Sequence, residues 1–461
     1  MELSAGLADC LENTAPSTAV RINRRKVAED ALPAIAAGGK NVAWCRSGFY
    51  LPVRPDFTHD PAMHQGVYYV QDASSMILHR VVEWLAGELE RERGAGGSPL
   101  RYLDGCAAPG GKTTAAIDAL PEGSVVVANE FDFRRAEILK ENVVKWGYPN
   151  VVVSRGDTAR FCRLAGMFDI VAADVPCSGE GMMRKDETAR TQWSEGLVGE
   201  CAALQRQIAA NLWEALRPGG YMIYSTCTFN QVENEGNVEW MVAEFGAERV
   251  EVPLPPDSGI VTDGTGTMRF LPTRTEGEGL FMAVLRKPAD GSAREAMVDA
   301  GGRKGRKENR KGGKKGGSGK ESPMLKDCRN VCGGWLREGF TVVPDGDVIV
   351  AVPEGMLELT GGLEQNLDVI YRGVELGTVK GRSVVPSQAL ALSTALCADA
   401  FKRVDVDLPT ALAYLRRESL PSMGGTKGFV LLCYGGRPLG FVNNLPNRAN
   451  NLYPQHWRIL K

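Results

Sequence analysis

The stretch that decides the fold reads LRYLDGCAAPGGKTTAAIDAL over residues 100–120. Its first residues predict a short strand, and GGKTTAAIDAL predicts a helix. The small residues between them let the backbone approach a ligand closely, and the first amides of a helix attract a carboxylate or a phosphate. The turn is not a Walker A loop, because five residues instead of four separate Gly105 from the pair Gly111-Lys112. On this stretch alone, an ordinary tight turn between strand and helix stays open.

The same order of strand and helix continues to about residue 287. The further strand-like runs are SVVVANE (124–130), VVVS (151–154), FDIVAAD (168–174) and YMIYST (221–226), and the further helical runs are DFRRAEILKENVVKWG (132–147) and LQRQIAANLWEALRPGG (204–220), the last ended by its Pro-Gly-Gly. Strands that alternate with helices predict a doubly wound α/β domain, Rossmann-like, with a parallel sheet. Ligands of such sheets bind at the carboxyl ends of the strands.

The flanking segments predict further units. Residues 1–95 combine short strands with an amphipathic helix within 67–92, which predicts an α+β extension before an α/β domain at 96–287. Residues 288–325 are rich in Gly, Lys, Ser and Arg, which is typical of a disordered linker. After it, residues 326–461 carry mixed signals, with short strands such as TVVPDGDVIVAVP and a helix in PSQALALSTALCADAF.

Composition excludes several classes of protein. The chain has 461 residues, 43% hydrophobic and 24% charged, which is ordinary for globular domains and too apolar for global disorder. No apolar run reaches the length of a membrane span, and the N-terminus lacks the features of a secretory signal, so we expect a cytoplasmic protein without a membrane partner. Eleven cysteines in such a chain predict reduced thiols. The net charge is −2, but residues 303–320 hold nine Lys and Arg against one acid.

Three acidic residues follow predicted strands. Glu130 ends the second strand, where an acid can accept hydrogen bonds from a nucleotide ribose; an acidic cap on the next helix is the open alternative. Asp157 and Asp174 follow the third and fourth strands, and each alone is more often a solvated loop residue. Asp174 differs because it opens the sequence Asp-Val-Pro-Cys, in which Pro176 stiffens the loop.

Two cysteines follow the fourth and fifth strands. Cys177 lies in the loop after Asp174, and Cys227 lies in Ser-Thr-Cys-Thr after the fifth strand, so both are expected at one rim of the sheet. A thiolate is a strong nucleophile, which points to covalent chemistry, whereas two small buried apolar side chains are the alternative. We expect no metal, because neither cysteine belongs to a Cys-x-x-Cys pair and no histidine is near them in sequence.

Together, these motifs resemble the RNA cytosine-5 methyltransferases of the Sun/nucleolar-protein family. The resemblance rests on DGCAAPGGKTT (104–114), ADVPCSGEGMMRKD (173–186) and YSTCTFNQVENEGNVEW (224–240). Residues 48–77 and 371–393 resemble the N-terminal extension and the connecting segment of the bacterial ribosomal RNA members, and 435–461 resembles their C-terminal PUA-like RNA-binding domain. The resemblance thus covers most of the chain except 288–325, and it implies a connecting domain at 326–385 and a PUA-like α+β or β-barrel domain at 386–461.

The resemblance implies a role for each candidate residue. S-adenosylmethionine is the implied cofactor, with Glu130 at its ribose, Asp157 near its adenine and Asp174 between cofactor and target base. Cys227 is the implied nucleophile, and Cys177 assists release of the product. Val175 stands where the family usually has alanine, a minor departure. The implied cofactor loop comprises Cys106, Ala107, Ala108, Pro109, Gly110, Gly111 and Lys112.

The implied reaction explains why these residues are needed. Carbon 5 of cytosine is a poor nucleophile until a thiolate adds to carbon 6, and Asp174 could stabilise charge that develops during this addition. The target base must be unpaired or flipped out. The implied substrate is RNA, 16S ribosomal RNA or the small ribosomal subunit, with transfer RNA as the alternative.

Other interpretations stay open at this point. A P-loop-like nucleotide-binding protein is disfavoured by the spacing of the glycine turn, and a non-catalytic RNA-binding scaffold is disfavoured by the presence of Asp174, Cys177 and Cys227 together. The basic run at 303–320 either adds salt-sensitive affinity for phosphates or is a plain tether. We expect a monomer with no obligate protein partner.

Overall fold

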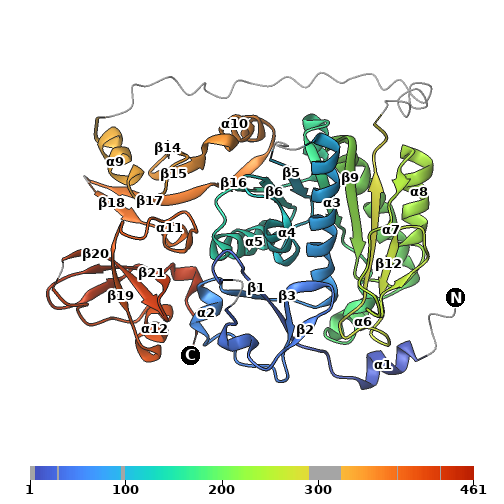
Figure 1. Ribbon diagram of the computed structural model, residues 1–461, viewed down its shortest axis with the longest axis horizontal. Coiled ribbons are helices and arrows are strands. Elements are labelled where there is room, and N and C mark those ends of the chain that lie inside the picture. Colours follow the sequence, from blue (N-terminus) through green and yellow to red (C-terminus); the bar gives the residue numbers. More distant parts are fainter. Residues whose placement is uncertain are drawn as a thin grey trace.

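The computed structural model describes residues 6–28, 31–94, 99–289, 323–381, 383–425 and 427–460. The basic run at 303–320 lies outside these residues. The described residues form four sheets, of which the largest, with ten strands, occupies the centre (Figure 1). Within the described residues, no helix combines the length and the apolar character that crossing a bilayer requires. All eleven cysteines have free thiols in this structure.

The N-terminal unit is a four-stranded antiparallel sheet in the order β2-β3-β1-β4, followed by a long helix. Its elements are α1 (Leu7–Asn13), β1 (Ala19–Ile22), η1 (Ala34–Ala36), β2 (Lys40–Val42), β3 (Cys45–Tyr50), α2 (Pro61–His64), β4 (Tyr68–Val70), η2 (Ser74–Met76) and α3 (Ile77–Arg93). Helix α3 buries an apolar stripe that includes Ile77, Leu78, Val81 and Leu85, and this stripe packs on one face of the central sheet. The predicted strand and amphipathic helix are therefore confirmed.

The central sheet has the strand order β11-β12-β13-β9-β8-β5-β6-β7-β16. Strands β5 to β9 are parallel, as the alternation of strands and helices predicted, and β13 pairs antiparallel with β9. The elements of this part are β5 (Arg101–Asp104), α4 (Gly111–Ala119), β6 (Val125–Glu130), α5 (Phe133–Trp146), β7 (Val151–Arg155), η3 (Thr158–Leu164), β8 (Phe168–Asp174), η4 (Glu180–Met182), α6 (Glu187–Gln192), α7 (Glu195–Ala215), β9 (Leu216–Thr226), α8 (Glu235–Phe245), β10 (Glu248–Arg249), β11 (Val261–Thr262), β12 (Thr267–Phe270) and β13 (Leu280–Arg286).

Helices cover both faces of this sheet (Figure 1). Successive residues of a strand point to opposite faces, so Tyr102 packs with α3, α4 and α5, whereas Leu103 packs with α7 and α8. Both ends of the helix predicted at 204–220 differ: α7 begins at Glu195 and ends at Ala215, and Pro-Gly-Gly lies within β9 instead of ending the helix. Pro218 cannot donate a backbone hydrogen bond, and the pairing of β9 with β8 shifts register across it.

The C-terminal part contains two four-stranded sheets, ordered β14-β15-β17-β18 and β19-β20-β21-β22. Its elements are α9 (Pro323–Gly333), β14 (Phe340–Asp345), β15 (Val348–Pro353), η6 (Glu354–Met356), α10 (Leu357–Asn366), β16 (Asp368–Arg372), β17 (Val374–Lys380), β18 (Ser383–Pro386), α11 (Gln388–Leu392), β19 (Lys402–Asp405), α12 (Leu408–Leu415), β20 (Gly428–Tyr434), β21 (Arg437–Asn444), β22 (Ala449–Asn451) and η7 (Gln455–Trp457). The helix expected at 386–401 is much shorter in the structure. Only α11 forms there, and the Ser387 hydroxyl caps its start.

The C-terminal part is joined to the rest of the molecule at several places, two of which involve backbone groups of named strands and loops. Strand β16 pairs antiparallel with β7 and so adds an outer strand to the central sheet. The Gln65 amide of the N-terminal unit donates hydrogen bonds to the carbonyl oxygens of Tyr434 and Arg437, at 3.0 and 2.7 Å. The segment proposed as a connecting domain, 326–385, therefore contributes a strand to the sheet of the domain that precedes it.

Candidate active site

The loop between β5 and α4 is fixed against the end of β6. The backbone N–H of Ala107 donates to the Asn129 carbonyl at 2.8 Å, and that of Ala108 donates to Glu130 Oε2 at 3.2 Å. A side chain at Gly105 would require Leu212 of α7 to move, since a Cβ there would lie 2.4 Å from a methyl carbon of that leucine. The glycine turn is thus shaped by contacts with β6 and α7, and it faces a cavity.

This cavity has a volume of about 500 Å³ and lies at the carboxyl ends of β5, β6 and β8. Its lining brings together seven of the predicted residues, Cys106, Ala108, Glu130, Asp157, Asp174, Cys177 and Cys227. Ala107, Pro109, Gly111 and Lys112 line a neighbouring cavity of about 210 Å³, which shares Cys106, Ala108 and Asp174 with the first. Gly110 lines neither cavity; it has a positive φ of 110° and precedes the first residue of α4.

The carboxylate of Glu130 is turned toward the glycine loop. Glu130 is buried, and its Oε1 also accepts from the backbone N–H of Asp132 at 3.0 Å. The alternative role, a cap on the next helix, belongs instead to Asp132, whose side chain accepts from the N–H groups of Arg134 and Arg135. Asp157 is exposed at the cavity rim and accepts from Ala159 N at 2.8 Å, so it also caps η3.

The two predicted cysteines lie in contact. Their sulfur atoms are 3.2 Å apart, and both side chains are partly buried. The loops that carry them are bonded to each other, since Gly181 N donates to the Cys227 carbonyl at 2.8 Å. Gly181 has no room for a side chain, because a Cβ would lie 2.8 Å from that carbonyl oxygen.

Asp174 is held between a cation and a hydroxyl group. Lys112 Nζ lies 2.9 Å from Asp174 Oδ2, and Ser225 Oγ donates to Asp174 Oδ1 at 2.7 Å. Lys112 comes from the N-terminus of α4, and Ser225 comes from β9, two residues before Cys227. The sequence identified Lys112 only as part of the cofactor loop, and it did not identify Ser225 at all. The Asp174 side chain is therefore held in a fixed orientation beside Cys227.

The pKa values of the two thiols are shifted in opposite directions. The pKa of Cys227 is lowered, mainly because it accepts a hydrogen bond from the Cys177 thiol and also because of the nearby Lys112 ammonium. The pKa of Cys177 is raised well above its ordinary value, because its proton is held in that hydrogen bond and because it is buried. Cys227 is thus the more acidic thiol of the pair, and Cys177 is the less acidic one.

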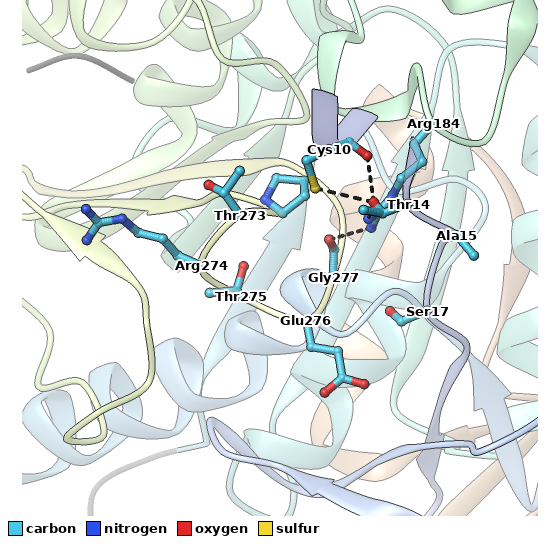
Figure 2. Close-up of a pocket in the computed structure, with 11 residues that line it drawn as sticks. Cys10, Thr14, Ala15, Ser17, Arg184, Thr273, Arg274, Thr275, Glu276 and Gly277 are labelled. Atoms are coloured by element: carbon cyan, nitrogen blue, oxygen red, sulfur yellow. Dashed lines mark hydrogen bonds between the residues drawn. The ribbon is translucent and has the colours of Figure 1, made fainter. Parts of the chain in front are cut away.

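The loop that follows Cys177 is anchored by Arg184 to two other parts of the chain (Figure 2). The Arg184 guanidinium donates to both carboxylate oxygens of Glu278 at 2.9 Å and to the Gly277 carbonyl at 2.8 Å. It also donates to the Thr14 hydroxyl at 3.0 Å, next to an open pocket of about 340 Å³. The N-terminal extension thereby contacts the loop that carries one of the two thiols.

Two buried acids near the site were missed by the sequence reasoning. Asp104 ends β5, and burial raises its pKa to about 7. Glu233 follows Cys227 by six residues and is completely buried, although most glutamates are exposed. Both residues lie inside the motifs quoted above, and only their burial distinguishes them from ordinary loop acids.

The large cavity suits the chemistry of S-adenosylmethionine. The buried Glu130 carboxylate can accept hydrogen bonds from a ribose diol, and Asp157 offers an acceptor for an amino group. Apolar walls for an adenine ring are present in Phe131, Pro176 and Ile208. Its volume also lies in the range of small-molecule sites.

The Rossmann-like fold and this site define a class, the S-adenosylmethionine-dependent methyltransferases. Three family models match the chain in order: "N-terminal domain of 16S rRNA methyltransferase RsmF" at residues 3–73, "16S rRNA methyltransferase RsmB/F" at 98–286 and "Methyltransferase RsmF PUA domain" at 401–459. "Ribosomal RNA small subunit methyltransferase F" from Salmonella newport (strain SL254) is 30% identical over 453 residues, 95% of this chain and 89% of that protein. The chain belongs to the family of ribosomal RNA small subunit methyltransferase F and is an RNA methyltransferase.

Other relatives agree with this assignment. The protein of the same name from Klebsiella pneumoniae (strain 342) is 28% identical over 448 residues, 95% of this chain and 89% of the relative. Among solved structures, a methyltransferase homolog protein from Pyrococcus horikoshii is 26% identical with a TM-score of 0.51, covering 61% of this chain and 89% of that one. NSun6 from the same organism, at 20% identity, has the same fold with a TM-score of 0.53, covering 63% of this chain and 95% of its own.

Proposed function

We propose that this enzyme methylates carbon 5 of a cytosine in 16S ribosomal RNA, and that Cys227 forms a covalent bond to carbon 6 of that base. The observation that carries the proposal is the contact between two cysteine side chains, Cys227 and Cys177, at the edge of the cofactor cavity. The names of the relatives favour ribosomal RNA of the small subunit over transfer RNA.

In this mechanism Cys227 starts the reaction. Its thiolate adds to carbon 6 as the bond between carbons 5 and 6 opens, and carbon 5 gains the electron density that accepting a methyl group requires. S-adenosylmethionine supplies, when bound, a methyl group on a positively charged sulfur. Asp174, held by Lys112 and Ser225, is placed to hydrogen-bond the base and stabilise the charge that develops on its ring.

Release of the product breaks the carbon–sulfur bond that Cys227 formed in the first step. A base takes the proton from carbon 5, the electron pair restores the bond between carbons 5 and 6, and the carbon–sulfur bond to Cys227 breaks. The Cys177 thiol contacts the departing sulfur and can stabilise it with the same hydrogen bond that the free enzyme makes. Glu130 and Asp157 would hold the cofactor throughout.

The test compares two cysteine variants on RNA from a strain that lacks this gene. Cys227→Ala should abolish methyl transfer and leave binding of S-adenosylmethionine intact, whereas Cys177→Ala should accumulate a protein–RNA adduct that survives denaturation. Sites are mapped by bisulfite sequencing. Methyl transfer by Cys227→Ala would refute the assigned nucleophile, and a signal confined to transfer RNA would refute the substrate.

We further propose that the enzyme works in the cytoplasm as a monomer without an obligate protein partner. The chain contains its own cofactor cavity, thiol pair and contacts between extension and site. Light scattering on the purified enzyme, free and with RNA, tests this proposal, and activity that requires a dimer would refute it.

A further inference from the structure

A buried carboxylate lies behind the thiol pair and takes no direct part in the mechanism above. Glu233 is completely buried, and both of its oxygens accept hydrogen bonds. No lysine or arginine among the described residues forms an ion pair with it. Its donors are Ser178 N (3.1 Å), the Ser178 hydroxyl, Gln205 Nε2 (2.6 Å) and Asn230 Nδ2 (2.7 Å).

These donors place Glu233 between the two cysteine loops. Ser178 directly follows Cys177, and Asn230 lies three residues after Cys227. Gln205 of α7 also donates to the carbonyl oxygen of Pro176 at 2.9 Å. The backbone is therefore held on both sides of Cys177 by one carboxylate and its glutamine partner.

A second carboxylate completes the connection from the other side. Glu180 Oε2 accepts from the backbone N–H groups of Phe229 and Asn230, at 2.8 and 2.9 Å. The sulfur–sulfur distance of 3.2 Å between Cys177 and Cys227 thus follows from bonds to acidic side chains rather than from apolar packing alone.

The charged groups near Cys177 differ from those near Cys227. An anion near a thiol disfavours the thiolate, so Glu233 opposes ionisation of Cys177, and the Lys112 ammonium favours ionisation of Cys227. Asp174 opposes ionisation of Cys227 but is paired with Lys112. The charged groups nearby on the packed elements are Lys112 on α4, Asp174 on β8, Glu180 on η4, Glu233, Arg206 on α7, and the ion pair of Glu235 with Arg269 on α8 and β12.

We propose that Glu233 is a positioning residue for Cys177: it fixes this thiol against Cys227 and keeps the proton of the pair on Cys177. The effect of Glu233 on product release rests on the proposed function, because in that mechanism a protonated and fixed Cys177 is needed to release Cys227 from the product. Its electrostatic part concerns the free enzyme and does not need RNA.

The central experiment is Glu233→Gln, which removes the charge and keeps the size of the side chain. Limited alkylation by iodoacetamide, followed by peptide mass spectrometry, measures how the label divides between Cys177 and Cys227. In the wild type the label should go almost entirely to Cys227. In the variant the ratio of Cys227 to Cys177 label should fall about tenfold or more, since a neighbouring charge changes a pKa by about one unit or more.

The matched control is Glu235→Gln, two residues along the chain. Glu235 is paired with Arg269 and has no hydrogen bond to either cysteine loop except through that arginine, which donates to the Phe229 carbonyl. In the Glu235→Gln variant the label should stay on Cys227. With RNA, Glu233→Gln should accumulate the denaturation-resistant adduct and turn over at least tenfold more slowly, at unchanged affinity for S-adenosylmethionine.

A second variant covers the case in which Glu233→Gln does not fold. Ser178→Ala keeps the charge of Glu233 and removes one of its hydrogen bonds, so it should accumulate adduct while the label stays on Cys227. Two results would overturn the inference: a folded Glu233→Gln with wild-type label ratio and release, or a Ser178→Ala that releases product normally where Glu233→Gln cannot be made. The two proposals can fail separately. If Cys177→Ala forms no adduct while Glu233→Gln still shifts the label between the cysteines, the proposed function is refuted and the role of Glu233 in placing the proton stands.

Discussion

Replacing Lys112 by methionine tests whether the site's electrostatics produce the reactive thiolate. The Lys112 ammonium lies 2.9 Å from Asp174, and the two side chains are 18% and 29% exposed. At this distance the attraction of two charges is about 1.4 kcal/mol in the fully screened limit, and it is larger where water is excluded. Methionine keeps most of the apolar stem and removes the charge together with the hydrogen bond to Asp174.

The variant should raise the pKa of Cys227 for two reasons. The ammonium that favours the thiolate is lost, and Asp174 is left as an uncompensated anion, held only by Ser225. A charge close to an ionisable group changes its pKa by about one unit or more. At a pH below the pKa, the thiolate fraction of Cys227 should therefore fall about tenfold.

The assay is the rate of alkylation of Cys227 by iodoacetamide between pH 6 and 10, followed by mass spectrometry. The control is Lys140→Met, because the pair of Lys140 with Glu375 has the same 2.9 Å distance and similar exposure, 27% and 30%, outside the site. Both variants should lose a similar free energy of unfolding, about 1 kcal/mol or less. An identical pH profile for the two variants would refute the reasoning.

Three further predictions concern the surroundings of the site. Burial raises the folded-state pKa of Asp104 to about 7, above its unfolded value. The wild type should therefore lose stability relative to Asp104→Asn as pH rises from about 4 to about 7, by up to about 4 kcal/mol. Thermal melting of both proteins at pH 5 and pH 8 measures this, and the same stability difference at both pH values would disprove it. Glu130→Gln should weaken binding of S-adenosylmethionine about tenfold, measured by calorimetry, and an unchanged affinity would exclude its ribose contact. Gly181→Ala should cost about 1–3 kcal/mol in urea unfolding, because its Cβ meets backbone, whereas Gly199→Ala on α7 meets nothing and should not destabilise.

The sequence predicted those parts of the fold that depend on local pattern. The strands at 101–104, 125–130 and 168–174 and the glycine turn each carry their own signal, and the rule for parallel sheets then places Asp174, Cys177 and Cys227 at one edge. The addition of β16 to the central sheet was not predicted, because the sequence of a five-residue strand does not specify which strand it pairs with.

The limits of the site prediction have a physical cause as well. Glu130 was recognised by its place after a strand, and the structure decides between its two possible roles through Asp132, which caps the helix. Glu233 could not be recognised, since a glutamate among other acids reads as a solvated residue until its burial is known. The pairing of Lys112 with Asp174 depends on two loops that are distant in sequence.

The pairing of β7 with β16 bears on how this chain is synthesised. Strand β7 is entirely apolar over Val151–Val153, and its outer edge is covered only by a strand that ends at Arg372. A chain that emerges from the ribosome N-terminus first therefore carries an unpaired apolar strand edge while the remaining domains are translated. A protein cut after β13 would keep this edge permanently. It should aggregate or associate edge to edge even though every catalytic residue is present, so the methyltransferase domain should be expressed together with β16.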